Sequence, residues 1–235
     1  MELRDNFGGN GESKEEEAKE EDPKSASKSN INLLIVLGVI LMLFLSVFAV
    51  KLFIKPKNIT IEGMFVRTLE GKTNPETNYM YNGYAFVKVG PLWYTKWQVD
   101  EYLLNIPLHH GPLELENITA EGKLDERFNS GSYYITFEPY SEDLTSIALA
   151  AGEIGRNLVE GFAAKIKSAC AANHTGCGTK PIITCENTNS SVIYIKESNE
   201  SKIVMKGNCL VIEGKGEDLI KAADRVILQI YGIMK

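Results

Sequence analysis

The sequence predicts one membrane-spanning helix near the N-terminus, followed by an α+β domain with a mostly antiparallel sheet and two long amphipathic helices. Three observations predict this fold. Residues 31–50 carry no charge, short β-branched and aromatic segments follow them, and two later segments have apolar residues at helical spacing. Because turn-forming residues separate several strands, hairpins are favoured over helical crossovers, and an α+β fold over an alternating α/β fold.

The charge of the chain excludes one broad class of function. The 235 residues carry a formal net charge of −6, with a pI near 5.3. A general nucleic-acid binder usually presents a basic patch, so we expect no nucleic-acid partner. Residues 1–30 account for −4 of this charge, with nine acidic and five basic side chains. Since they show no sustained apolar periodicity, we expect a disordered acidic tail.

The uncharged run from Ile31 to Val50 is long enough to cross a bilayer. Twenty residues in a helix span roughly 30 Å, the thickness of the hydrocarbon core. A cleaved signal peptide is the alternative, but its apolar region is shorter and its leader is short and basic. We therefore expect an uncleaved transmembrane helix over 31–54. A linker over 55–60 follows, because Pro56 ends a helix.

The residues after the span indicate which side of the membrane the domain occupies. Lysines and arginines flank the span equally, so the positive-inside rule decides nothing. All four cysteines follow the span, and an even number suits a disulfide framework. Five glycosylation triplets also follow it, at Asn58, Asn117, Asn173, Asn189 and Asn199. We expect a single-pass protein of the cell membrane, with the tail cytoplasmic and a glycosylated domain outside.

The domain over 61–235 is predicted to begin with strands and to continue with a helix, more strands and a second helix. The first strands are expected over 83–89, 101–110 and 132–138. Apolar residues from Leu144 to Ile166 recur at helical spacing, and Ser141 can cap that helix. Further strands are expected over 181–186, 192–196, 203–205 and 209–213, and a last helix over 217–231. The change near residue 138 from predicted strands to a predicted helix suggests two lobes, 61–138 and 139–235.

The positions of the cysteines favour one of the three pairings that four cysteines allow. Cys170 and Cys177 flank a short loop after the long helix, so they can clip that loop. Cys185 and Cys209 lie in predicted strands, so they can bridge the C-terminal sheet. A zinc site is the alternative, but spacings of 7, 8 and 24 include no C-x2-C knuckle.

Motifs of catalysis are missing from the sequence. It has no G-x-S-x-G elbow, no P-loop and no dinucleotide fingerprint, and paired cysteines leave no free thiolate. We therefore predict no catalytic residue and no cofactor. His109, His110 and Glu114 form the one dense group of metal-capable side chains. Adjacent histidines on a strand point to opposite faces, which disfavours joint ligation, so they are weak candidates.

Aromatic residues concentrate in the first half of the domain. Eight of the 21 aromatic residues lie between Tyr79 and Tyr102. Most are expected in the core of the sheet or in cross-strand pairs. Trp93, Tyr94 and Trp97 are the candidates for an exposed shelf that binds a glycan or protein, because they follow the turn at Gly90.

A resemblance extends over about residues 80–235. The segments "YYITFEPYSEDLTSIALAAGEIGRNLVEG", "PIITCENTNSSVIYIKE" and "GNCLVIEGKGEDLIKAADRVILQIYGIMK" resemble uncharacterised archaeal single-pass membrane proteins with an exported, disulfide-containing domain. This resemblance implies a microbial cell surface. It implies no known activity, so it transfers no site residue.

These observations lead to one functional prediction with two alternatives. We predict a membrane-anchored cell-surface domain, a non-enzymatic binding or structural component of the cell envelope, whose partners are the lipid bilayer and an envelope protein or glycan. The first alternative is a metal-dependent envelope enzyme that uses His109, His110 and Glu114. The second is a pilin-like subunit, against which counts the lack of a basic-Gly processing site before Ile31. The oligomeric state stays open.

Overall fold

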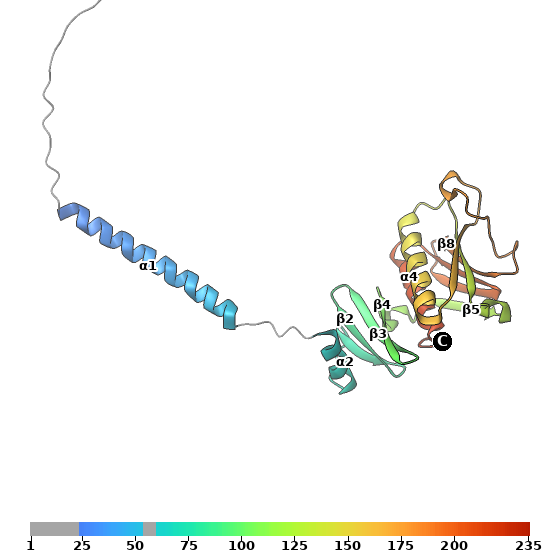
Figure 1. Ribbon diagram of the computed structural model, residues 1–235, viewed down its shortest axis with the longest axis horizontal. Helices are drawn as coiled ribbons and strands as arrows, with labels where there is room; N and C mark the ends of the chain where they lie inside the picture. Colours follow the sequence, from blue (N-terminus) through green and yellow to red (C-terminus); the bar gives the residue numbers. More distant parts are fainter. Residues whose placement is uncertain (1–23, 54–59) are drawn as a thin grey trace, which may run out of the picture. The chain divides into compact units, whose positions relative to one another are not determined.

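The computed structural model describes residues 24–53 and 60–235 (Figure 1). The chain divides into two compact units, Met1–Asn58 and Ile59–Lys235. Residues 1–23 of the predicted tail (1–30) and most of the predicted linker lie outside the described residues, and so does the glycosylation candidate Asn58. Residues 24–30 of the tail are helical, contrary to the expected disorder.

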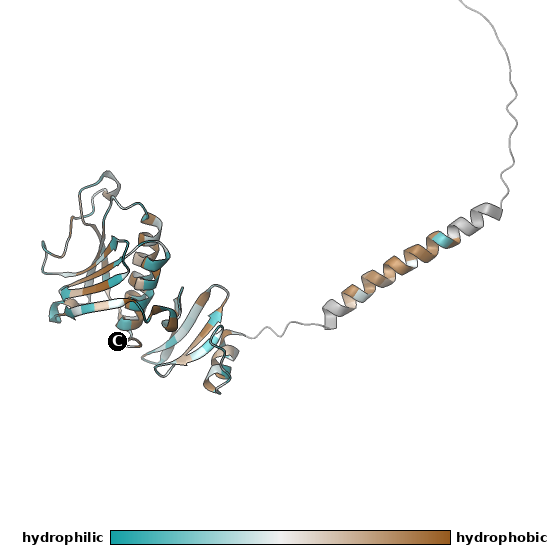
Figure 2. Ribbon diagram, turned by 180° about the vertical axis from the view of Figure 1, so that it is seen from behind, coloured by the Kyte–Doolittle hydropathy of each residue, from teal (hydrophilic) through white to brown (hydrophobic). Residues whose placement is uncertain are grey.

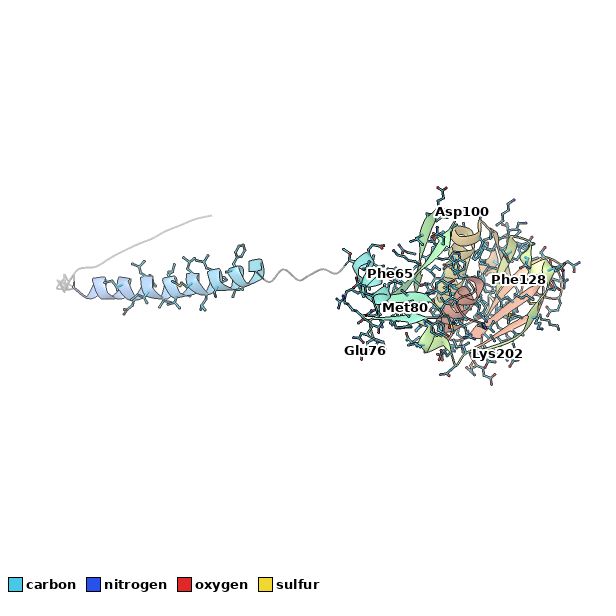
Figure 3. All side chains as sticks on the ribbon, turned by 90° about the horizontal axis from the view of Figure 1, so that it is seen from below. Phe65, Glu76, Met80, Asp100, Phe128 and Lys202 are labelled. Carbon is cyan, nitrogen blue, oxygen red and sulfur yellow. A yellow bond between two sulfur atoms is a disulfide. The ribbon has the colours of Figure 1, made fainter. Side chains whose placement is uncertain are left out.

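The first unit contains one long helix, α1 (Lys24–Phe53). Its segment Ile31–Ala49 has a mean hydropathy of 2.9 and no buried residue. Figure 2 shows most of this segment in the brown of hydrophobic residues, and Figure 3 shows its side chains projecting from the helix on opposite sides. Within the described ranges, α1 is the one helix long and apolar enough to cross a membrane. Such a helix fits a membrane anchor or a signal sequence. It begins at Lys24, seven residues before the predicted start at 31.

The second unit begins with a helix and a four-stranded antiparallel sheet, called sheet A. Its strands are β1 (Asn78–Tyr81), β2 (Tyr84–Val89), β3 (Leu92–Val99) and β4 (Tyr102–Leu108), paired in chain order. Asn82 and Gly83 both have positive φ, as a tight hairpin between β1 and β2 requires. Helix α2 (Ile61–Leu69) packs Phe65 against Ala85 and Val87 of sheet A.

A six-stranded mixed sheet, called sheet B, forms the rest of the unit with helices α4 (Leu144–Phe162) and α5 (Glu217–Ile230). The strands of sheet B are β5 (Thr119–Leu124), β6 (Ser132–Phe137), β7 (Lys165–Cys170), β8 (Ser191–Glu197), β9 (Lys202–Gly207) and β10 (Cys209–Gly214). Their order is β5-β9-β10-β8-β6-β7. Short helices lie at α3 (Pro112–Leu115), η1 (Glu126–Asn129) and η2 (Thr175–Cys177).

The prediction of a mostly antiparallel sheet holds for sheet A and is wrong for sheet B. In sheet B only β9 and β10 pair antiparallel, and the other neighbours are parallel. Parallel neighbours need a long crossover, and α4 supplies it between β6 and β7. Since β5 and β6 belong to sheet B, the predicted lobe boundary at 138 does not separate the two sheets.

Helix α4 is shorter than the predicted helix at both ends. Asp143, rather than Ser141, accepts the Ser146 N–H as the N-cap. At the other end Ala163 adopts a left-handed conformation with φ of 51°, which ends the helix. Ile166 therefore lies in strand β7 and not on the helix. The predicted strand over 181–186 reduces to one bridge between Ile182 and Cys170.

Helices α4 and α5 cover one face of sheet B and share a core with sheet A. Nine of the 14 residues of α5 are buried. One cluster of buried apolar side chains joins Phe86 and Ile106 of sheet A to Ile193 of sheet B and Ile227 of α5. Gly161 lies so close to Tyr231 that an added Cβ would be 2.6 Å from its hydroxyl, so only glycine fits there. The second unit is therefore packed around α5.

Both predicted disulfides are present. Cys170 is bonded to Cys177 and Cys185 to Cys209, with Cα–Cα distances of 6.3 and 5.5 Å. The second bridge ties the loop that precedes β8 to the central strand β10. The four glycosylation candidates that the structure describes, Asn117, Asn173, Asn189 and Asn199, are exposed.

Loss of the Cys185–Cys209 bridge should lower stability more than loss of the Cys170–Cys177 bridge. The bridge from 185 to 209 closes a separation of 24 residues, against 7 for the other. Loop entropy assigns about 3 kcal/mol to the longer loop and about 2 kcal/mol to the shorter. Thermal unfolding of the two double Cys→Ala variants measures the difference, and equal melting temperatures would contradict this order.

Candidate functional site

A cluster of ionisable side chains lies where sheet A meets the two large helices. His109 and His110 directly follow β4, Glu153 lies on α4, and Glu217 and Asp224 lie on α5. His110 and Asp224 are buried, and His109 and Glu153 are partly buried. These five residues come from three separate parts of the chain, and we call them the His-Glu-Asp cluster.

One carboxylate oxygen of Asp224 accepts three hydrogen bonds from the two histidines. The backbone N–H groups of His109 and His110 donate to Oδ2 at 3.1 and 2.8 Å, and His110 Nδ1 lies 3.0 Å from the same atom. The side chain of Asp224 is fully buried. The other oxygen, Oδ1, has no hydrogen-bond partner among the described residues. Burial raises the pKa of Asp224, and the contacts with His110 oppose this shift.

The ring of His110 bridges two carboxylates of α5. Its Nε2 lies 3.3 Å from Oε1 of Glu217, while its Nδ1 contacts Asp224. Burial of the ring opposes protonation, but the hydrogen bond and charge of Asp224, with help from Glu217, outweigh it and raise the pKa of His110. The imidazole ring of His110 therefore both forms an ion pair with Asp224 and fixes the orientation of its carboxylate.

His109 and Glu153 form the more exposed side of the cluster. Nδ1 of His109 lies 3.0 Å from Oε1 of Glu153, without the alignment of a hydrogen bond. Oε2 of Glu153 is buried and has no partner among the described residues. Burial raises the pKa of Glu153 to about 7, and the neighbouring charge of Asp224 adds to the shift.

Glu114, which the sequence grouped with the histidines, makes its hydrogen bonds to other residues and is not one of the converging side chains. Glu114 lies in α3, where Oε1 accepts from Trp93 Nε1 at 3.1 Å and from Gly111 N at 3.0 Å. Glu153 and Asp224, which replace it in the cluster, carry no recognisable motif. One signal was present for Asp224, since it lies four residues from both Ile220 and Leu228 on the buried side of α5.

The three residues of the predicted aromatic shelf, Trp93, Tyr94 and Trp97, are buried or partly buried in the domain. Trp93 is 3% exposed and packs edge-on against Tyr79, so it is not an exposed residue beside the Gly90 turn. Trp97 is partly buried and stacks on Tyr84. Tyr94 is partly buried against the cluster that α2 forms with sheet A. Cross-strand and core packing therefore accounts for all three side chains.

An apolar pocket opens between sheet B and the C-terminal parts of α4 and α5. Its volume is about 470 Å³. Its wall combines the helix-covered face of the sheet, the two helices, η1 and the last residues of the chain. The residues that line it are Leu124, Phe128, Asn129, Tyr133, Leu158, Phe162, Met205, Leu210, Val226, Gln229, Ile230, Met234 and Lys235. Phe128 is labelled in Figure 3.

Comparison with known proteins identified no relative of this chain. No protein-family model, curated protein or solved structure matches the chain. The two sites that the structure offers for a function are the His-Glu-Asp cluster and the apolar pocket.

Replacing Glu153 by Gln should change how stability depends on pH. The folded-state pKa of Glu153, about 7, lies above its ordinary value of 4.5. A carboxyl whose pKa is raised by folding stabilises the protein below its unfolded pKa, and this contribution is lost as the pH rises through the folded pKa. We expect the wild type to lose about 1–3 kcal/mol relative to Glu153→Gln between pH 4.5 and 7.5.

Urea unfolding of the full chain at a series of pH values, with chelator present, measures this effect. The difference between the two proteins is the informative quantity, because His110 and Asp224 titrate in both. A difference that does not change with pH would contradict the burial of an ionisable Glu153.

Proposed function

We propose that this chain is a membrane-anchored binding domain of the cell envelope, which holds an apolar chain such as an acyl chain in the pocket of sheet B. The domain faces the outside, α1 crosses the membrane once, and the acidic tail is cytoplasmic. The apolar pocket carries the proposal. The absence of a catalytic motif in the sequence favours binding over catalysis.

Three features support the location outside the cytoplasm. Helix α1 has the length and hydropathy of a transmembrane helix. Two disulfides lie in the second unit, and disulfides persist in oxidising compartments. The asparagines of the four described glycosylation triplets are exposed, as modification of an exported protein requires. Together they favour an exported domain that stays attached to the membrane.

The pocket has the size and lining of a site for an apolar molecule. Ligand sites commonly have volumes of about 300–1,000 Å³, are mostly apolar and contain a few polar groups. This pocket has about 470 Å³ and ten apolar or aromatic residues in its wall, with three polar ones, Asn129, Gln229 and Lys235. Asn129 and Lys235 are exposed, so they mark its open end. We infer that an apolar chain enters there and leaves its polar end beside these two residues.

The bilayer supplies the ligand in this proposal. Six residues separate Phe53, the end of α1, from Thr60, the start of the described domain. A chain segment this short tethers the domain to a membrane-spanning α1, so in this proposal the domain stays at the membrane. Lipids are then the apolar molecules that the pocket meets at the highest local concentration.

A membrane-impermeant, amine-reactive reagent tests the orientation. In intact cells that produce the full chain, we expect labelling of lysines after residue 60, such as Lys88 and Lys123, and none of Lys14 and Lys19. Permeabilised cells should show labelling of both groups, which controls for reactivity. Labelling of the tail alone in intact cells would invert the topology and remove the support from the disulfides.

A bulky substitution inside the pocket should block ligand binding. Met205 lines the pocket from β9, whereas the neighbouring Val204 points to the opposite face of the sheet. We expect Met205→Trp to reduce labelling of pocket peptides by a photoactivatable fatty acid about tenfold, equal to roughly 1.4 kcal/mol. Val204→Trp is the matched control and should leave the labelling unchanged.

The experiment uses the full chain in lipid nanodiscs, and the crosslinked peptides are mapped by mass spectrometry. Labelling of α1 by the same probe serves as an internal standard, since that helix contacts lipid in every variant. Labelling confined to α1 in the wild type would overturn the pocket proposal. A partner-binding role would then be favoured, and crosslinking to a neighbouring envelope protein or glycan would identify it.

A further inference from the structure

Three side chains of the His-Glu-Asp cluster offer ligand atoms that converge on one point. His109, Glu153 and Asp224 each have one such atom within 4.8 Å of those of the other two. Their exposed side-chain fractions are 34%, 12% and 0%, so the group lies below the surface and is open on the His109 side. They arise from the end of β4, from α4 and from α5. No local sequence motif brings them together.

Unpartnered polar atoms are concentrated at this point. Asp224 Oδ1, Glu153 Oε2 and His109 Nδ1 are buried, and none has a hydrogen-bond partner among the described residues. Buried polar groups almost always have partners, so three unpartnered atoms in one cluster call for an explanation. A proton shared between His109 and Glu153 would satisfy those two residues and leave Asp224 Oδ1 without a partner. A cation bound by one atom of each residue would give Asp224 a partner as well.

The surroundings of Asp224 resemble the second layer of a metal site. Its Oδ2 is held by two backbone N–H groups and by the ring of His110, so Oδ1 has a fixed direction. Groups that hold ligands in this way are regular features of metal centres. His109 Nδ1 and Glu153 Oε1 lie 3.0 Å apart without hydrogen-bond alignment. Ligand atoms about 2.1 Å from one ion lie roughly 3.0–3.5 Å apart, which agrees with this spacing.

The donor set selects the class of ion. One imidazole nitrogen and two carboxylates suit Zn²⁺, Mn²⁺, Fe²⁺ and Co²⁺. Ca²⁺ and Mg²⁺ prefer oxygen ligands alone, and Cu⁺ prefers thiolates or thioethers. Three protein ligands leave room for at least one water molecule on the side of His109.

We propose that His109, Glu153 and Asp224 bind a divalent first-row transition metal ion. The ion joins the end of sheet A to α4 and α5, and His110 acts as a positioning residue by holding Asp224. This site is independent of the apolar pocket, since none of its residues lines that pocket.

The full chain in detergent micelles, stripped with chelator and dialysed, tests the proposal. We expect Zn²⁺ to bind with one-to-one stoichiometry by calorimetry and to raise the melting temperature, while Mg²⁺ and Ca²⁺ do neither. Co²⁺ should give visible absorption bands of a nitrogen- and oxygen-ligated ion. Removal of a ligand by Glu153→Gln or His109→Ala should weaken Zn²⁺ binding at least tenfold and abolish these bands, and His110→Gln should weaken binding about 10–100-fold.

Matched variants separate the site from adventitious binding. Glu160→Gln changes an exposed carboxylate on the same helix and should leave Zn²⁺ affinity unchanged. His174→Ala removes a histidine of the cysteine loop and should also have no effect. Circular dichroism confirms that each variant is folded. Zn²⁺ binding that is absent from the wild type, or equal in the wild type and both ligand variants, would overturn the proposal.

Discussion

The buried carboxylate of Asp224 connects the two halves of the second unit. It lies on α5, and it accepts hydrogen bonds from His109 and His110, more than 110 residues earlier in the chain. A buried charge without such donors would cost several kcal/mol. The end of β4 must therefore stay against α5 for the domain to be folded. Within this unit, that contact holds sheet A against α5, in addition to the apolar core that sheet A shares with sheet B.

Helix α5 can occupy this position because it is buried on most of its surface. Sheet B covers one side through β10, and α4 and α3 contact it on other sides. The two histidines that follow β4 hydrogen-bond to it through Asp224. Arg225, also buried, donates to the carbonyl groups of Leu115 and Lys235. Its two terminal nitrogens are thus satisfied by backbone groups of neighbouring segments. Two buried polar atoms of this helix, Asp224 Oδ1 and Arg225 Nε, have no hydrogen-bond partner among the described residues, and Asp224 Oδ1 motivates the metal site.

The two proposed sites lie at different parts of the α4–α5 pair, and they require different spacings between these helices. The pocket needs space between the C-terminal parts of α4 and α5, whereas the metal site needs close approach near Glu153 and Asp224. An ion at the metal site would hold the two helices together without filling the apolar pocket. The disulfide at Cys209 fixes β10, the strand on which α5 packs, so the sheet beneath the pocket is also braced.

The local sequence pattern was sufficient for several parts of this protein. The uncharged run predicted α1, and helical periodicity predicted α4 and α5 to within a few residues at most ends. The positions of the cysteines in a predicted loop and in predicted strands favoured the two disulfides that are present. Strands β2, β4, β6, β8, β9 and β10 were also expected near their observed positions. In each case the responsible forces act between residues close in the chain, or depend on composition alone.

The order of the strands and the composition of the sites depended on tertiary structure. Strand β10 lies between β8 and β9, which no local pattern indicates, and α4 proved to be a crossover between parallel strands. Trp93 became a core residue because Glu114 and Tyr79 enclose it. His109 contacts Glu153 and Asp224, whereas Glu114 hydrogen-bonds to Trp93. Contacts of this kind join residues 44 and 115 positions apart, and only packing of the whole core decides which distant side chains become neighbours.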